Sequence, residues 1–311
     1  MTDVSAPNAV LGNGLAITAL FAFSANIVVT RLATSLMNLN LGFVIAVTVN
    51  AVVALIFLGC QIAWRGSTPD WNWTAAANFT AAGVFATFLG RWIFFESIVY
   101  LGAARASAFQ VSSPVFVALL GSFLLNERLS VQAMVGILVT VLGLVVLSSL
   151  SSKKSGGDAK LEHGGHSWKV LLSLGLGSSL AYAIGNVFRG AAVRSWDEPI
   201  LGALLGAIVG LLLHLSVSWR KLSGTAILAN VNRQGVIMYM LSGALTIIGQ
   251  ILMITAMTSI PVATTSVITL CTPLLVLPMS WLWLKKQEAI TPATIAGIVM
   301  TLLGVTAVVV N

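Results

Sequence analysis

Apolar residues dominate the chain in long runs, which short polar segments separate. The runs show no strict alternation of apolar and polar residues, and this argues against the strands of a transmembrane barrel. Each run is close to the roughly 20 residues that a helix needs to cross a bilayer core. The pattern predicts ten transmembrane helices, at about 10–30, 41–63, 76–100, 103–125, 130–150, 169–189, 199–219, 235–258, 261–284 and 291–310.

Composition excludes several classes of protein. Of the 311 residues, 58% are hydrophobic and 8% are charged, whereas a soluble domain carries roughly 25% charged residues. So few polar groups cannot cover the surface of a soluble enzyme or a disordered chain. The net charge of +7 does not indicate nucleic acid, because the bases stand singly in short loops. We expect a multi-pass protein of the cell membrane, with a bacterial inner membrane as its location.

One polar segment, 151–168, interrupts the apolar pattern near the middle of the chain. Its Gly, Ser and Lys content is typical of a mobile aqueous loop. We expect it to link two five-helix domains, 1–150 and 169–311.

The two domains repeat one pattern at offsets of 159 to 161 residues. The matched pairs include Gly90 and Gly249, Pro114 and Pro273, Thr140 and Thr301, and Gly143 and Gly304. Because each domain has five spans, the second enters the membrane from the opposite side. The pattern therefore predicts an all-α inverted-topology repeat, an architecture typical of secondary transporters with a substrate site between the halves.

Several short motifs in these repeats resemble the EamA domain of the drug/metabolite transporter superfamily. The first domain carries the resemblance through the small-residue stretch at 100–108, Ser113-Pro114, Glu127-Arg128 and Gly136, and the second through Pro273, Glu288, Thr291, Gly297 and Gly304. The second domain departs from the pattern where Ala289 follows Glu288 in place of Arg. The resemblance implies two tandem EamA domains that transport small molecules, with helices five and ten packed outside a central cavity. It does not specify the substrate, since the family moves amino acids, nucleotide sugars, amines and drugs on one scaffold.

Arg91 is the charge that the helical pattern explains least. It lies ten residues before the turn at Leu101, which places it about 15 Å into the bilayer at 1.5 Å per residue. No carboxylate stands three or four residues away on its own helix. A guanidinium there suits a carboxylate or phosphate ligand, although a structural arginine that binds helix carbonyls is the alternative.

Other polar and aromatic residues in the predicted helices complete a candidate substrate site. Singly, such residues commonly bond helix to helix in membranes, but together they predict a cavity with aromatic walls and polar donors. The candidate substrate-binding residues are Asn26, Arg91, Trp92, Gln110, Ser113, Tyr182, Asn186 and Gln250.

Glu96 and two prolines are further candidates. Glu96 either forms an interfacial ion pair with Arg105 or carries a coupled proton. Pro114 and Pro273 each free a carbonyl four residues earlier, and their matched positions predict hinges.

The basic residues bear on orientation. Loops on the side of the termini hold Arg65, Arg128, Arg189 and Arg194, whereas the opposite loops hold eleven bases. The positive-inside rule therefore predicts that both termini lie outside the cytoplasm. The resemblance implies the reverse, because such relatives are generally drawn with cytoplasmic termini.

These patterns together predict a secondary transporter that exports small metabolites such as amino acids or related amphipathic compounds, by alternating access with possible proton coupling. Neither a phosphate-binding loop nor a metal-binding motif occurs, so we expect no cofactor, no metal and no enzymatic activity. Uncoupled uptake or exchange is the first alternative, and a channel and a membrane enzyme acting on a lipid-linked substrate are others. The expected partners are the substrate and the lipid bilayer, in a monomer or a homodimer.

Overall fold

Helices make up the described part of the chain, which contains no strand. The computed structural model describes residues 6–125, 168–222, 231–260, 262–283 and 292–309, and short helical pieces between 131 and 146. The predicted linker up to residue 167 and the Glu127-Arg128 pair lie outside the described residues.

The first domain contains α1 (Ala6–Thr34), α2 (Leu39–Arg65), α3 (Trp73–Ala82), the π-helix η1 (Gly83–Gly90), α4 (Arg91–Leu101), α5 (Ala103–Gln110) and α6 (Ser113–Leu125). The second contains α9 (Trp168–Ser195), α10 (Pro199–Leu222), α12 (Arg233–Ser259), α13 (Val262–Leu270), α14 (Thr272–Trp283) and α15 (Pro292–Val309).

Within the described residues, five helical segments are long and apolar enough to cross a membrane. They are Ala9–Thr34, Leu39–Arg65, Trp73–Leu101, Pro199–Ser218 and Arg233–Ser259. The all-helical class and the multi-pass character predicted from the apolar runs are thus confirmed. The ten-span inverted arrangement itself stays a prediction.

Local chemistry explains where several helices begin and end. The Asn72 side chain accepts from the backbone N–H of Ala75 at 3.1 Å and so caps the start of α3. Gly66 ends α2 in the left-handed region, with φ of 71°. Gly102, with φ of 83°, makes the turn from α4 into α5. This turn separates the predicted spans 76–100 and 103–125.

The two predicted prolines stand at helix breaks. Pro114 and Pro273 each occupy the second position of a new helix, α6 and α14, where a missing N–H leaves no hydrogen bond unmade. Matching turns precede them, in which the Ser112 N–H donates to the Phe109 carbonyl at 3.1 Å and the Cys271 N–H to the Ile268 carbonyl at 3.2 Å. The continuous runs 103–125 and 261–284 are therefore each two helices, because the proline ring obstructs the preceding turn.

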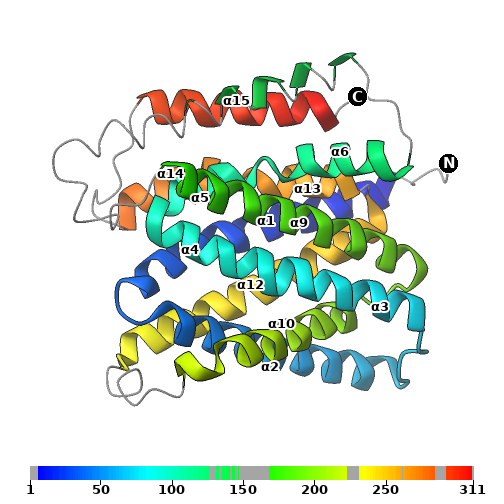
Figure 1. Cartoon of the computed structure of the whole chain (residues 1–311). Coiled ribbons are helices and arrows are strands. Elements are labelled where there is room, and N and C mark those ends of the chain that lie inside the picture. The colour runs from blue at the N-terminus through cyan, green and yellow to red at the C-terminus, as the bar shows by residue number, and fades with distance from the viewer. Residues whose placement is uncertain are drawn as a thin grey trace.

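The two domains pack on each other reciprocally. In the first domain α1 lies along α12 and also contacts α13 and α14. In the second, α9 lies along α3, η1 and α4 and also contacts α5 and α6. The first helix of each domain thus packs on the third and fourth predicted spans of the other (Figure 1).

At one edge of the molecule, α15 lies beside the helical pieces of 131–146 (Figure 1). Their contact is close and reciprocal. A Cβ added at Gly143 would lie 2.7 Å from the backbone nitrogen of Thr301, and one at Gly304 would lie 2.5 Å from that of Thr140. Gly at these positions lets the two backbones approach, as in other membrane helix pairs.

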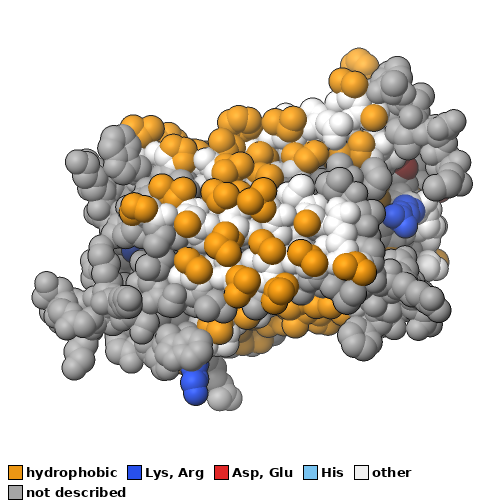
Figure 2. Space-filling view, turned by 90° about the horizontal axis from the view of Figure 1, so that it is seen from above, with side chains coloured by type: hydrophobic (Ala, Val, Ile, Leu, Met, Phe, Trp, Pro, Cys, Tyr) orange, Lys and Arg blue, Asp and Glu red, His pale blue; other side chains and the backbone are white. Residues whose placement is uncertain are grey.

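The outer surface suits contact with lipid. Ile295, Val299 and Leu303 of α15 are exposed and recur every four residues, so they form one apolar face. Figure 2 shows apolar side chains over the middle of this side of the molecule and the described charged side chains toward its ends. Such a band matches a hydrocarbon layer between two polar regions.

Candidate substrate-binding cavity

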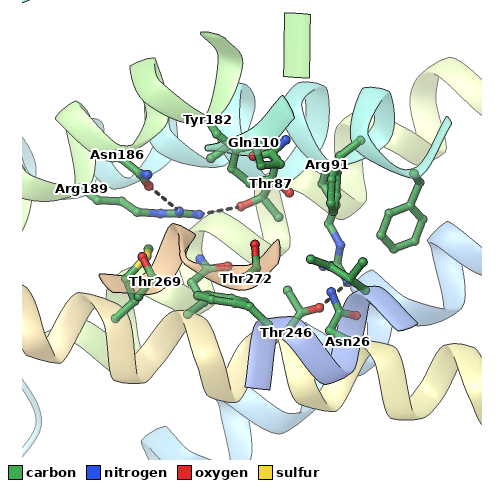
Figure 3. A pocket seen from close by; sticks show the side chains of 17 residues that line it. Asn26, Thr87, Arg91, Gln110, Tyr182, Asn186, Arg189, Thr246, Thr269 and Thr272 are labelled. Atoms are coloured by element: carbon green, nitrogen blue, oxygen red, sulfur yellow. Dashed lines mark hydrogen bonds between the residues drawn. The ribbon is translucent and has the colours of Figure 1, made fainter. Parts of the chain in front are cut away.

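A cavity of about 790 Å³, counted with its opening to solvent, lies where the two domains meet. Helices of both domains line it, namely α1, η1, α4 and α5 from the first and α9, α12, α13 and α14 from the second. Its polar lining groups are Asn26, Thr87, Arg91, Gln110, Tyr182, Asn186, Arg189, Thr246, Gln250, Thr269 and Thr272 (Figure 3). The apolar lining includes Phe23, Phe94, Phe95 and Met253.

Most of the substrate-binding residues predicted from the sequence meet in this cavity. Asn26, Arg91, Gln110, Tyr182, Asn186 and Gln250 all line it. Trp92 and Ser113 are not among the lining residues. The Trp92 ring lies 5.8 Å from Phe88 and 6.0 Å from His214, between centroids. A contact of Trp92 or Ser113 with substrate stays a prediction.

Arg91 is almost completely buried, with 2% of its surface exposed. Its Nη2 donates to Thr246 Oγ1 on α12 at 3.2 Å. With its amide oriented to donate to the carbonyls of Ala46 and Gly243, Asn50 accepts from Arg91 Nη1. Phe95 lies 5.3 Å from the guanidinium carbon, so the charge is held by neutral dipoles and an aromatic ring.

A π-helix positions Arg91. The eight residues of η1 run directly into α4, of which Arg91 is the first residue. A π-helix has a wider turn than an α-helix and so rotates the residues that follow it, and such segments are frequent at functional sites. Periodicity of the apolar residues did not predict this change of helix type.

Arg189 is the functional candidate that the sequence interpretation missed. The sequence places it in a loop, but α9 continues to Ser195, so Arg189 lies inside the helix and is 4% exposed. Its Nη1 donates to Asn186 Oδ1 at 3.1 Å and its Nη2 to Thr87 Oγ1 at 3.4 Å. The short apolar stretch that follows it, Gly190 to Val193, was the available signal that the helix continues.

Hydroxyl and amide groups organise the rest of the lining. Asn26 Oδ1 accepts from Ser242 Oγ at 2.6 Å, which ties α1 to α12. Gln110 Nε2 donates to Ser178 Oγ at 2.9 Å, which ties α5 to α9. These bonds join the two domains around the cavity and fix the orientation of its amides.

The charge of the cavity is positive. Among the described residues that line it are two guanidiniums and no Asp or Glu. Elsewhere in the described chain, Glu198 pairs with Arg65 and accepts from Gln61 Nε2 at 3.0 Å, at the ends of α2 and α10. Among the described residues no group of three or more His, Cys, Asp or Glu side chains could hold a metal ion.

Glu96 and the two prolines lie outside the cavity lining. Glu96 is half-buried on α4, five residues beyond Arg91. Pro114 and Pro273 follow the breaks after α5 and α13, and those two helices contribute Gln110 and Thr269 to the cavity. Roles in proton coupling and as hinges stay predictions.

A multi-helix bundle with a polar cavity between its two domains is typical of membrane transporters. The model of the EamA-like transporter family matches residues 10–149 and 169–310. The chain therefore belongs to the EamA-like transporter family, which is part of the drug/metabolite transporter superfamily. The resemblance noted in the sequence is confirmed, including its two tandem copies.

Two curated relatives share part of the chain. An uncharacterized transporter of Archaeoglobus fulgidus is 32% identical over 140 residues, which are 44% of this chain and 47% of the relative. The uncharacterized transporter YxxF of Bacillus subtilis is 31% identical over 131 residues, 41% of each chain. The matches thus span less than half the length of these relatives.

A solved crystal structure shares the fold over nearly the whole length. It superposes with a TM-score of 0.63 and covers 96% of both chains, at 14% sequence identity. At this identity the likeness speaks for the fold alone.

Proposed function

We propose that this protein is a secondary transporter that carries a small anionic metabolite by alternating access. The observation that carries the proposal is Arg91, a buried guanidinium in a cavity that no carboxylate of the described residues lines. A charged side chain inside a membrane-spanning segment is costly, so its presence there indicates a function. An anionic group of the substrate supplies the negative charge that pairs with the Arg91 guanidinium.

The arrangement of the two domains supports alternating access. Each domain presses its first helix against the third and fourth spans of the other, so an exchange of conformation between the halves preserves the packing. We propose that the ten predicted spans form two inverted repeats that open the cavity to either side in turn. The breaks before Pro114 and Pro273 are the proposed hinges.

Counterflow in proteoliposomes tests this function. Proteoliposomes that contain the purified protein are loaded with an excess of one unlabelled compound, and uptake of the same compound in labelled form is followed. The compounds tested are amino acids, monocarboxylates, dicarboxylates and sugars. A carrier gives transient, saturable accumulation for at least one anionic class, which neither a channel nor an enzyme produces. Absence of counterflow for every compound would contradict the proposal.

Arg91→Gln is the matching variant. We expect it to raise the half-saturating concentration of anionic substrates at least about tenfold, because a hydrogen bond to a charged group contributes about 1.5–3 kcal/mol. Arg194→Gln, at an exposed position on α9, removes the same charge outside the cavity and serves as control. An equal loss for neutral and anionic substrates would show that Arg91 only supports the fold.

Export is the proposed direction. Inside-out and right-side-out vesicles of cells that produce the protein would be compared for uptake of the substrate found by counterflow. Faster uptake into inside-out vesicles supports export, and faster uptake into right-side-out vesicles contradicts it.

A further inference from the structure

Each of the two guanidiniums in the cavity donates to a threonine, and these two threonines are equivalent in the two repeats. Thr87 and Thr246 occupy matching positions at the offset of 159 residues. Thr246 accepts from Arg91 and Thr87 accepts from Arg189. Each domain thus supplies one threonine, and each threonine holds an arginine that comes from the other domain.

The two arginines themselves are not equivalent in sequence. Arg91 matches Gln250, which also lines the cavity but carries no charge. The internal repeat alone therefore does not explain why the cavity contains two arginines. Two guanidiniums are nevertheless bound to matching threonines, one in each domain.

The two guanidiniums enter from different sides of the cavity. In Figure 3 Arg189 extends from one side toward Thr87, and Arg91 descends on the other side toward Thr246. Tyr182 lines the cavity together with both arginines. The space between them is polar and includes Thr272 and Gln110.

Their charge is uncompensated within the cavity. Arg91 and Arg189 are 2% and 4% exposed, and their hydrogen bonds go to neutral amides and hydroxyls. Arg91 Nε has no hydrogen-bond partner among the described residues. A buried charge is stabilised most by a partner of opposite sign, and the neutral groups around these two guanidiniums leave both able to bind an anionic group.

The same lining disfavours a cationic group on the ligand. An amino acid carries an ammonium, which is usually met by a carboxylate in a binding site. In the part of the chain that the structure describes, no Asp or Glu lines the cavity. Beside two guanidiniums, an ammonium would be repelled.

We infer that the substrate is a small organic dianion with two separate acidic groups, one bound by Arg91 and the other by Arg189. This inference rests on the proposed transport function and narrows its substrate class. Arg189 is the residue that determines specificity, because it separates dianions from monoanions. The amide and aromatic side chains between the arginines contact the part of the ligand that joins its two acids.

Matched pairs of ligands test this inference. Succinate is compared with butyrate, and glutarate with pentanoate, in counterflow and in thermal stabilisation of the detergent-purified protein. Each pair has the same carbon number and differs in one carboxylate. We expect the dicarboxylates to bind at least about tenfold more tightly than their partners, as a second charge-assisted hydrogen-bonded pair requires.

Arg189→Gln should remove this preference. The variant is expected to weaken dicarboxylate binding at least about tenfold and to change monocarboxylate binding less than about twofold. Arg189→Lys keeps the charge and should retain part of the preference. Arg194→Gln, which lies one turn further along α9 at an exposed position, should behave as the unaltered protein.

Several outcomes would overturn the inference. They are equal binding of both members of each pair, tighter binding of alanine than of succinate, and an equal loss of both ligand types in Arg189→Gln. Stabilisation by inorganic phosphate equal to that by succinate would indicate a single compact anion site. If no compound shows counterflow, the transport proposal fails separately, and thermal stabilisation still decides whether the cavity binds dianions.

Discussion

At the scale of single residues, the burial of Arg91 depends on what surrounds it. Asn50 is 0% exposed, and its amide joins the Arg91 guanidinium to the carbonyls of Ala46 and Gly243. Phe43 and Phe95 cover the guanidinium at 5.9 and 5.3 Å. Neutral dipoles of this kind lower the cost of the charge without cancelling it, so Arg91 remains available to an anion.

Asn50 can be tested as the residue that orients Arg91. Asn50→Leu removes the acceptor of a buried guanidinium N–H and the additional donor to two helix carbonyls, and an unsatisfied buried group of this kind costs about 1–3 kcal/mol. We expect a lower melting temperature and weaker anion binding in detergent. Asn13→Leu, at an exposed position on α1, is the control, and an unchanged melting temperature for Asn50→Leu would contradict this role.

Glu96 is the residue whose role is still a sequence prediction. If it carries a coupled proton, Glu96→Gln cannot release that proton, so transport should lose its dependence on a proton gradient while counterflow continues. The measurement compares uptake with and without an imposed pH difference. Asp197→Asn, at an exposed position, is the control. Unchanged pH dependence in Glu96→Gln would favour uncoupled exchange.

At the scale of elements, η1 is held by small residues on its neighbours. A Cβ added at Gly83 would lie 2.9 Å from the Cα of Gly206, and one at Gly210 would lie 2.7 Å from Thr87 Cγ2. Such close crossings allow α9 and α10 to approach the π-helix and to set its geometry. Arg91 and Arg189 depend on this contact, because η1 precedes the first and binds the second.

Gly185 tests the contact between α9 and η1. A Cβ at this position would clash with Ala86, so Gly185→Val should destabilise the protein by about 1–3 kcal/mol, as overpacking does. Gly177→Val on the same helix meets nothing within 4 Å and should change the melting temperature little. Thermal unfolding in detergent compares the two, and equal effects would contradict the tight crossing.

At the scale of the whole molecule, the membrane orientation follows from the distribution of charge. With Arg189 inside the cavity, the side of the termini holds even fewer loop bases than the sequence suggests. The 151–168 linker carries Lys153, Lys154 and Lys160 on the opposite side. The positive-inside rule therefore predicts that this linker lies in the cytoplasm.

A reporter inserted in the linker measures this orientation. Alkaline phosphatase is active outside the cytoplasm and green fluorescent protein inside it, so we expect fluorescence and no phosphatase activity. Replacing the three linker lysines with Gln should weaken the bias. Phosphatase activity in the unaltered linker would support the orientation that the family resemblance implies.

Much of the fold and part of the site could be predicted from the sequence. Apolar runs near 20 residues locate helices, because the thickness of a bilayer sets their length. Repeats reveal two domains, and a charge such as Arg91 stands out because few charges occur in such runs. Arg189 was missed because Asp197, Glu198 and Pro199 follow it closely, which resembles a loop after a finished span.

By itself the sequence determined that this is a helical membrane protein of two repeats, because hydropathy and internal similarity are properties of the chain order. Only the tertiary structure decided which charged side chains meet in the cavity. Packing of each domain's first helix on the other domain brings Arg91 to Thr246 and Arg189 to Thr87. These pairs lie 155 and 102 residues apart in the chain. A cavity with two cationic sites arises from such distant contacts, and no local pattern of residues records them.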